Sequence, residues 1–295
     1  MKTAARTTQK KTVQVLNVSI DNLSSDQLMA KLADGGVVYT TNVDHLMKLQ
    51  GDRDFYQAYS AADYRVCDSQ ILKYAARFLG TPVQEKISGS DLFPQFCDYY
   101  KHDDSVKIFL LGAAEGVAAE AMRRINKKAG RELVVAAHSP SYGFEKDEAE
   151  CQRVVEMINQ SGATVLAVGV GAPKQEKWIH RYRHQLPGVK VFMGVGATLD
   201  FEAGNVKRSP AWVSELGLEW LYRMSQEPGR LWRRYLLEDT AFFYLLLQQK
   251  MNRYRWSPTA HASRVKATKR PRLRLAAPRI QNQFVNHAVL HGLTK

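Results

Sequence analysis

Several polar residues capable of chemistry follow apolar runs of the sequence. Asp68 comes directly after Val66-Cys67 and precedes the helical run ILKYAARFLG. An aspartate at such a turn can cap the helix, a position at which Asp is strongly preferred. A carboxylate at a strand-to-helix turn over a sheet is also well placed to act as a general base. Position alone favours capping, and both interpretations stay open at this point.

The densest cluster of functional side chains is GAPKQEKW, residues 171–178. An apolar run ends there in glycines, a proline begins the next helix, and Lys174, Gln175 and Glu176 occupy its first turn. Proline and glutamate are ordinary helix-start residues. Lysine and glutamine beside the positive end of a helix dipole would also suit an anionic sugar nucleotide. The segment therefore predicts either a plain helix start or a nucleotide site.

Glycines at the ends of apolar runs offer backbone N–H groups to a nucleotide, and the candidates are Gly169, Gly171 and Gly196. The dinucleotide fingerprint G-x-G-x-x-G is incomplete, because GVGAPK supplies only its first two glycines. GAAEG, residues 112–116, also lacks the required spacing. A nucleotide-dependent oxidoreductase is therefore the weaker alternative, and no cofactor is expected.

The sequence gives no support for a metal site. Asp52-Arg53-Asp54 is a D-x-D, but it falls in a predicted helix, where side chains two residues apart point in different directions. The three cysteines, Cys67, Cys97 and Cys151, have no metal-type spacing and suit a reducing compartment. We therefore expect no bound metal and no disulfide.

Short apolar runs alternate with helical patterns through most of the chain. The predicted strands are 13–20, 36–42, 106–112, 132–139, 163–171 and 189–196. Helices are predicted between them, including a single one over 44–62. This alternation predicts an α/β fold with a Rossmann-like, doubly wound, mostly parallel sheet. Ligands bind such sheets at the carboxyl ends of the strands, where the glycine-rich turns fall.

The pattern changes to helices after Asn205, and the charge changes with it. Of the net charge of +13, the residues after Asp239 carry +11 and the first eleven residues carry +4, so the body between them is nearly neutral. We divide the chain as follows: 1–12, a flexible basic N-terminus; 13–209, a catalytic α/β domain; 210–256, a helical appendage; 257–295, a basic tail expected to be disordered. No signal peptide is expected, and the apolar run 241–247 is shorter than the roughly 20 residues that span a bilayer.

Three late motifs carry a specific family resemblance: GAPKQEKW, GVGATLDFEAGNVKRSPAW and GLEWLYRMSQEPGRLWRR. They resemble the WecG/TagA/CpsF glycosyltransferases, bacterial enzymes of surface-polysaccharide and wall-teichoic-acid synthesis. The resemblance runs from about residue 13 to residue 234. It implies an inverting, metal-independent transfer of a sugar from a UDP donor to a sugar on a polyprenyl-diphosphate lipid. The enzyme would then be cytoplasmic and peripherally associated with the inner face of the plasma membrane.

The resemblance also implies roles for individual residues. Asp68 matches the family's proposed base, which shifts its interpretation from cap to catalyst. The other implied substrate-binding residues are Thr40, Asn42, Lys86, Gln175, Arg223, Arg230 and Arg233. The three arginines would hold diphosphate charge, for which the planar guanidinium is suited.

This sequence departs from the family pattern at two positions near the expected sugar pocket. Cys67 and Ser69 flank Asp68 where the family has Pro-Asp-Gly, and Lys86 stands in place of the usual arginine. Lysine keeps the positive charge but loses the planar fork. The family's best-known donors, N-acetylmannosamine and its uronic acid, are therefore not carried over to this chain.

The predicted helix over 230–256 combines aromatic residues with basic ends. Trp232, Phe242, Phe243, Leu246 and Trp256 would suit a helix lying on a bilayer surface, and a core helix or an oligomer interface is the alternative. The basic tail would add attraction to anionic lipid. A homo-oligomer stays open. Nucleic-acid binding through the tail is the remaining rival, and the neutral body disfavours it.

Overall fold

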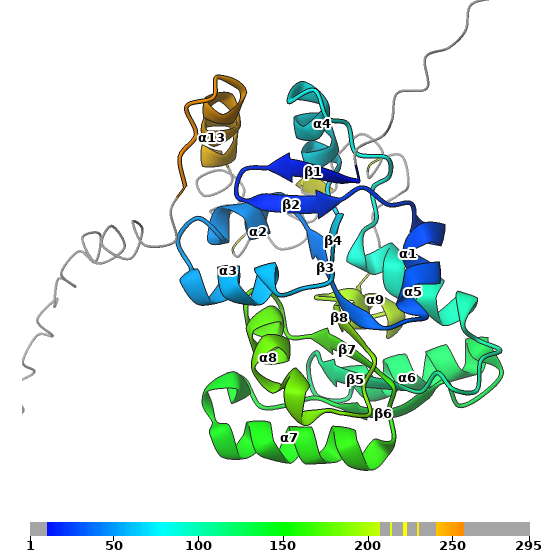
Figure 1. Ribbon diagram of the computed structural model, residues 1–295. Coiled ribbons are helices and arrows are strands. Elements are labelled where there is room, and N and C mark those ends of the chain that lie inside the picture. The colour runs from blue at the N-terminus through cyan, green and yellow to red at the C-terminus, as the bar shows by residue number, and fades with distance from the viewer. Residues whose placement is uncertain (1–10, 207–212, 214–220, 223–228, 230–239, 257–295) are drawn as a thin grey trace, which may run out of the picture.

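A six-stranded sheet forms the centre of the molecule (Figure 1). The computed structural model describes residues 11–206, 213, 221, 222, 229 and 240–256. In sheet order the strands are β4 (Tyr64–Cys67), β3 (Gly36–Thr41), β8 (Val191–Gly194), β7 (Val165–Gly169), β5 (Ile108–Gly112) and β6 (Val134–His138). Every neighbouring pair runs parallel. The predicted doubly wound parallel fold is therefore confirmed.

Helices cover both faces of this sheet. This is expected, because successive side chains of a strand point to opposite faces and apolar residues occur on both. On one face lie α2 (Val43–Lys48), α3 (Arg53–Ser60), α7 (Glu148–Ser161) and α8 (Lys174–Tyr182). On the other lie α1 (Ser25–Leu32), α5 (Gly89–Tyr99), α6 (Val117–Ala129) and α9 (Thr198–Glu202). In β3, Val37 and Tyr39 join the first core and Val38 joins the second. Two short 3-10 turns, η1 (Phe144–Lys146) and η2 (Arg183–Gln185), flank α7 and α8.

The predicted single strand over 13–20 is wrong, because this segment is an antiparallel hairpin. Strands β1 (Thr12–Val15) and β2 (Val18–Asp21) pair with each other. The reversal falls at Leu16, whose φ of 50° lies in the left-handed region. Arg65 fixes the hairpin to β4, since its backbone N–H donates to Asp21 Oδ2 at 2.8 Å and its Nε donates to the Ser19 carbonyl at 3.1 Å.

The predicted single helix over 44–62 is also wrong, because it is broken into α2 and α3. The break between Lys48 and Arg53 contains Gly51, and glycine is unfavourable in the interior of a helix. Asp52 then starts α3 as its N-cap, with Oδ1 accepting from the Phe55 N–H at 3.0 Å. Its other oxygen accepts from Lys177 Nζ at 2.6 Å. The D-x-D thus does not lie wholly within a helix. Asp52 caps α3 and forms an ion pair with Lys177.

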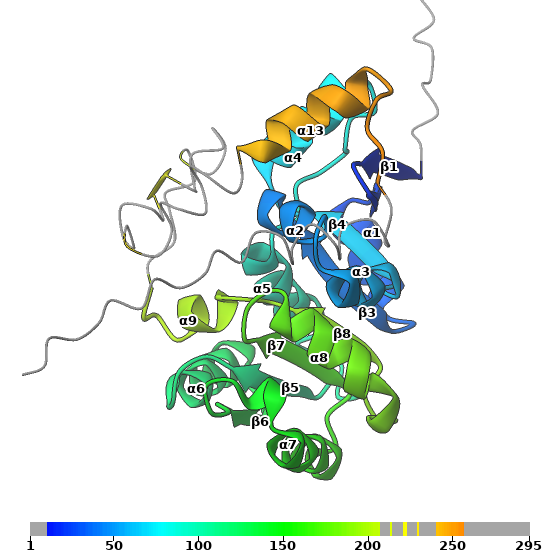
Figure 2. The same ribbon diagram turned by 90° about the vertical axis from the view of Figure 1, so that its left-hand side faces the viewer.

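Residues 240–256 contain helix α13 (Ala241–Lys250), which packs on α2. Here the expected helix stops short of Trp256, because Asn252 adopts a φ of 56°. Gln249 binds the hairpin twice: its Oε1 accepts from the Leu16 N–H at 2.7 Å, and its Nε2 donates to the Gln14 carbonyl at 3.0 Å. Figure 2 shows α13 at the same end of the molecule as α4 (Gln70–Phe78). None of the helices in the described ranges is long and apolar enough to cross a membrane.

Candidate active site

The carboxyl ends of β3 and β4 bring several predicted site residues together. The Asp68 N–H donates to the Thr41 carbonyl at 2.7 Å, so Asp68 lies at the end of β3 as well as β4. The segment that carries Lys86 runs alongside, because the Ile87 N–H donates to the Cys67 carbonyl at 2.7 Å. Asp68 and Lys86 are both half-buried. Carboxylate and ammonium group therefore belong to one edge of the sheet.

Asp68 does not cap α4. The N-cap is Ser69, whose hydroxyl accepts from the Leu72 N–H at 3.4 Å. The capping interpretation of Asp68 is therefore wrong, although its role as a base stays a prediction. Its neighbour Cys67 is no rival nucleophile, because burial raises the pKa of that thiol to about 12. At neutral pH Cys67 thus stays protonated.

Thr40 and Asn42 lie on the same edge, at the end of β3. Thr40 is buried, and the first turn of α5 packs over it closely: a Cβ at Gly89 would lie 3.3 Å from Thr40 Oγ1. Asn42 is the N-cap of α2, and its Oδ1 accepts from the His45 N–H at 3.0 Å. The expected substrate contacts of both residues stay predictions, and the structure adds a capping role for Asn42.

Gln175 lies at the start of α8 and is almost fully buried. Its Oε1 accepts two backbone N–H groups, from Gly171 at 3.2 Å and from Gly196 at 3.1 Å. Its Nε2 donates to Glu176 Oε1 at 2.7 Å. The amide of Gln175 thus joins the loop after β7 to the loop after β8, and its contact with a sugar stays a prediction.

The three candidate nucleotide-binding glycines lie at this edge, and of the three only Gly169 is tightly packed. A Cβ at Gly169 would lie 2.7 Å from the Gly196 carbonyl oxygen, so only glycine fits there. The N–H groups of Gly171 and Gly196 both donate to Gln175 in this structure. Packing and loop bracing therefore account for these glycines locally, and their contact with a nucleotide stays a prediction.

Three predicted diphosphate-binding residues, Arg223, Arg230 and Arg233, lie outside the described residues. The same holds for Trp232. Of the apolar residues predicted to form one membrane-facing surface, Phe242 and Leu246 are buried. Phe243 is exposed, whereas Trp256 is half-buried and packs on Tyr56 with ring centroids 4.2 Å apart. The predicted apolar surface is thus wrong for Phe242 and Leu246.

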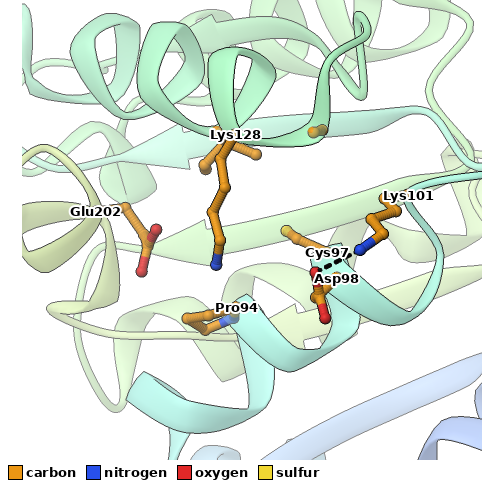
Figure 3. A pocket seen from close by; sticks show the side chains of 8 residues that line it. Pro94, Cys97, Asp98, Lys101, Lys128 and Glu202 are labelled. Carbon is orange, nitrogen blue, oxygen red and sulfur yellow. Dashed lines mark hydrogen bonds and ion pairs between the residues drawn. The ribbon is translucent and has the colours of Figure 1, made fainter.

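A small pocket lies away from this edge, between α5, α6 and α9 (Figure 3). Lys128 of α6 reaches toward Pro94 of α5, with Glu202 of α9 to one side. None of the predicted site residues lines it. Within the described ranges, no three His, Cys, Asp or Glu side chains gather as a set of metal ligands.

Sequence reasoning treated Glu176 as an ordinary helix-start residue and missed that its side chain is buried. Burial raises the pKa of this carboxyl group to about 7, although Gln175 and Lys48 favour its ionised form. A signal for it was present in the helical period. The apolar stripe of Trp178, Ile179 and Tyr182, extended back by one turn, falls on Gln175 and Glu176.

A wholly parallel α/β sheet with a carboxylate, a lysine and glycine-rich turns at its carboxyl edge is typical of the doubly wound class of ligand-binding proteins. Comparison with known proteins narrows this class. Residues 13–256 match the Glycosyl transferase WecG/TagA/CpsF family, and the chain belongs to that family. The family resemblance is thereby confirmed, and the oxidoreductase and nucleic-acid alternatives lose their support.

Two curated relatives carry the same name, N-acetylglucosaminyldiphosphoundecaprenol N-acetyl-beta-D-mannosaminyltransferase. The one from Bacillus spizizenii (strain W23) is 34% identical over 203 residues, which covers 68% of this chain and 75% of the relative. The one from Bacillus subtilis (strain 168) is 28% identical over 239 residues, covering 81% of this chain and 89% of the relative.

Proposed function

We propose that this glycosyltransferase moves a hexose or N-acetylhexosamine-type sugar from a UDP donor to a saccharide on polyprenyl diphosphate, with inversion at the anomeric carbon. Such a reaction belongs to exopolysaccharide, capsule or wall-polymer synthesis. The relatives' names support the acceptor class, since both act on an undecaprenol-diphosphate sugar. The observation that carries the proposal is the position of Asp68, which lies beside the end of β3 at the carboxyl edge of the sheet.

The proposed step is a single displacement. Asp68 accepts the proton of the acceptor hydroxyl as that oxygen forms its bond to the anomeric carbon. The bond from that carbon to the donor's diphosphate oxygen breaks on the opposite face, and UDP leaves with the electron pair. Lys86, on the same edge, and the arginines at 223, 230 and 233 would balance the diphosphate charge, with no metal required.

The Asp68→Asn variant tests this assignment. It should fold normally and lower turnover by on the order of 100-fold or more, the scale of losing a general base. Turnover would be measured with a panel of UDP-sugars and a lipid-diphosphate-sugar acceptor, with and without EDTA. Asp54→Asn, on the exposed surface of α3, is the matched control. Near-normal turnover in Asp68→Asn would remove Asp68 from the mechanism.

An exposed apolar face on α4 and α13 supports contact with the membrane surface. Tyr74 and Phe78 of α4 are about half exposed, as are Phe243 and Leu247 of α13. The two helices meet there, because Lys250 Nζ donates to the Phe78 carbonyl at 2.8 Å. Amphipathic aromatic surfaces with basic neighbours bind the boundary between headgroups and acyl chains. We assign this face to the bilayer that holds the lipid acceptor.

Vesicle binding tests the assignment of that face. Phe78→Ser combined with Phe243→Ser should weaken co-sedimentation with vesicles of anionic phospholipid. Tyr142→Ser, which changes a fully exposed aromatic residue elsewhere, is the control. A second comparison, truncation after Trp256, separates the basic tail from the apolar face, since only the tail's contribution should depend strongly on salt. Unchanged binding of the double variant at physiological salt would contradict the assignment.

A further inference from the structure

Glu176 is a buried carboxylic acid that the proposed transfer does not use. Its side chain is fully buried at the start of α8, on the face of the helix turned to the sheet. One oxygen, Oε1, accepts from Gln175 Nε2 at 2.7 Å. For the other, Oε2, the described residues offer no hydrogen-bond partner. An unsatisfied carboxyl oxygen in the interior costs stability, so its presence calls for an explanation.

The neighbours of Glu176 direct its carboxyl group toward Gln175. Gly194 closes the space on the sheet side, since a Cβ there would lie 2.8 Å from Gln175 Nε2 and 3.3 Å from Glu176 Oε1. On the strand next to it, the hydroxyl of Tyr39 donates to the Glu176 carbonyl at 3.2 Å and holds the backbone. The pair of side chains is therefore enclosed on the sheet side by glycine and fixed to β3.

The bond from Gln175 to Glu176 fixes which way the amide of Gln175 points. With Nε2 toward Glu176, Oε1 is directed to the N–H groups of Gly171 and Gly196. The reverse orientation would leave the N–H groups of Gly171 and Gly196 facing an NH₂ group, which cannot accept them. The loops after β7 and β8 carry the glycine-rich turns at the carboxyl edge of the sheet. Their separation therefore depends on this orientation.

We propose that Glu176 is a positioning residue for glycosyl transfer, which acts through Gln175 by holding its amide oxygen on the two glycine loops. The predicted effect of Glu176 on turnover rests on the proposed glycosyltransferase function. The structural part of the proposal does not, because the bracing of the loops can be observed in the absence of substrate. Lys48 works in the same direction from α2, as its Nζ donates to the Ala172 carbonyl at 3.1 Å in the first of these loops.

Amide hydrogen exchange on the full chain tests the structural part. In Glu176→Ala, exchange at Gly171 and Gly196 should accelerate at least 10-fold, as it should in Gln175→Ala, which removes the acceptor. Glu176→Gln keeps an oxygen for Gln175 Nε2 and should keep the protection. Glu176→Met, close in volume and without a carboxyl group, separates loss of the bond from loss of packing. Protection unchanged in both Glu176→Ala and Glu176→Met would overturn the proposal.

Turnover tests the functional part. Glu176→Ala and Gln175→Ala should lower kcat/KM for the donor by similar factors, and the double variant should be no worse than Gln175→Ala alone. Glu176→Gln should rescue most of the loss. Multiplying effects in the double variant would show that Glu176 acts independently of Gln175 and would contradict positioning. If the wild-type chain turned over no UDP-sugar while the exchange results held, the proposed function would fail and the brace would stand.

Discussion

Replacing Glu176 by glutamine should change how the stability of the fold depends on pH. Full burial raises the pKa of this carboxyl group from 4.5 to about 7, chiefly because the ionised form loses its hydration. Between these two values the folded chain keeps a proton that the unfolded chain has released. The free energy of unfolding therefore falls as the pH rises through this window.

The size of the effect follows from the two pKa values. At pH 8 the penalty for ionising Glu176 in the folded state amounts to about 3 kcal/mol, and it vanishes below pH 4.5. Glutamine has no proton to lose in this range, so the Glu176→Gln variant lacks the contribution. The charged groups nearest to Glu176, Asp44 and Lys48 of α2, act on its pKa in opposite directions, and Lys48 is the stronger of the two.

Urea unfolding from pH 5 to pH 8, followed by circular dichroism, measures the prediction. The difference in unfolding free energy between Glu176→Gln and the wild type should move by about 2–3 kcal/mol in favour of the variant across this range. Other titrating groups contribute equally to both proteins and cancel. Glu115→Gln, on an exposed turn before α6, is the matched control and should run parallel to the wild type. Parallel curves for Glu176→Gln as well would refute the reasoning, because the carboxyl group would then be ionised throughout.

Three further variants test the packing that positions the site. Gly169→Ala sets a methyl group against the Gly196 carbonyl and the Leu199 side chain, so thermal unfolding should show a loss of about 1–3 kcal/mol, and an unchanged melting temperature would contradict the close approach. Phe242→Ala empties a fully buried site under α13 and should cost about 3–5 kcal/mol in urea unfolding. Asp52→Ala loses the α3 cap and the bond to Lys177; its cost of about 1–2 kcal/mol would be measured in the same way, with Asp54→Ala as the control.

Five strands of the sheet were predictable from sequence because they are mostly apolar runs, as expected for strands covered on both faces. Strand β4 was missed, because YRVC is short, contains an arginine and is only partly buried. For the two elements that were predicted wrongly, one or two backbone positions decided the outcome. Leu16 in the left-handed region turns one apolar run into a hairpin, and Gly51 with Asp52 divides one helical pattern into two helices. The second break is marked in the sequence, because Gly51 is unfavourable inside a helix and Asp52 is a preferred N-cap residue.

The location of the candidate site at the carboxyl edge of the sheet was predictable, but the contacts of its residues were not. Asp68 and Thr40 reach the same edge because the parallel strands β3 and β4 end there together. Lys86 reaches it because the backbone of Ile87 is bound to that of Cys67, which the sequence order does not imply. The duties of Ser69 and Asn42 as caps depend on backbone angles set by the tertiary fold. The burial of Glu176 depends on the glycine opposite it at 194, a pairing between elements that no local pattern records.

The first turn of α8 was the most attractive anion site in the sequence, and its side chains bind within the protein. Lys174 pairs with Glu145 at 3.4 Å, and Gln175 and Glu176 bind the loops and each other. A donor's diphosphate would therefore depend on cations from elsewhere. Lys86, near Asp68 at the same edge, is one proposed cation, and the three arginines of segment 210–256 are the others that the family pattern offers. The appendage is thus expected to complete the donor site as well as to reach the membrane. The reason is that the polar side chains of the first turn of α8 are already bound to other groups of the α/β domain.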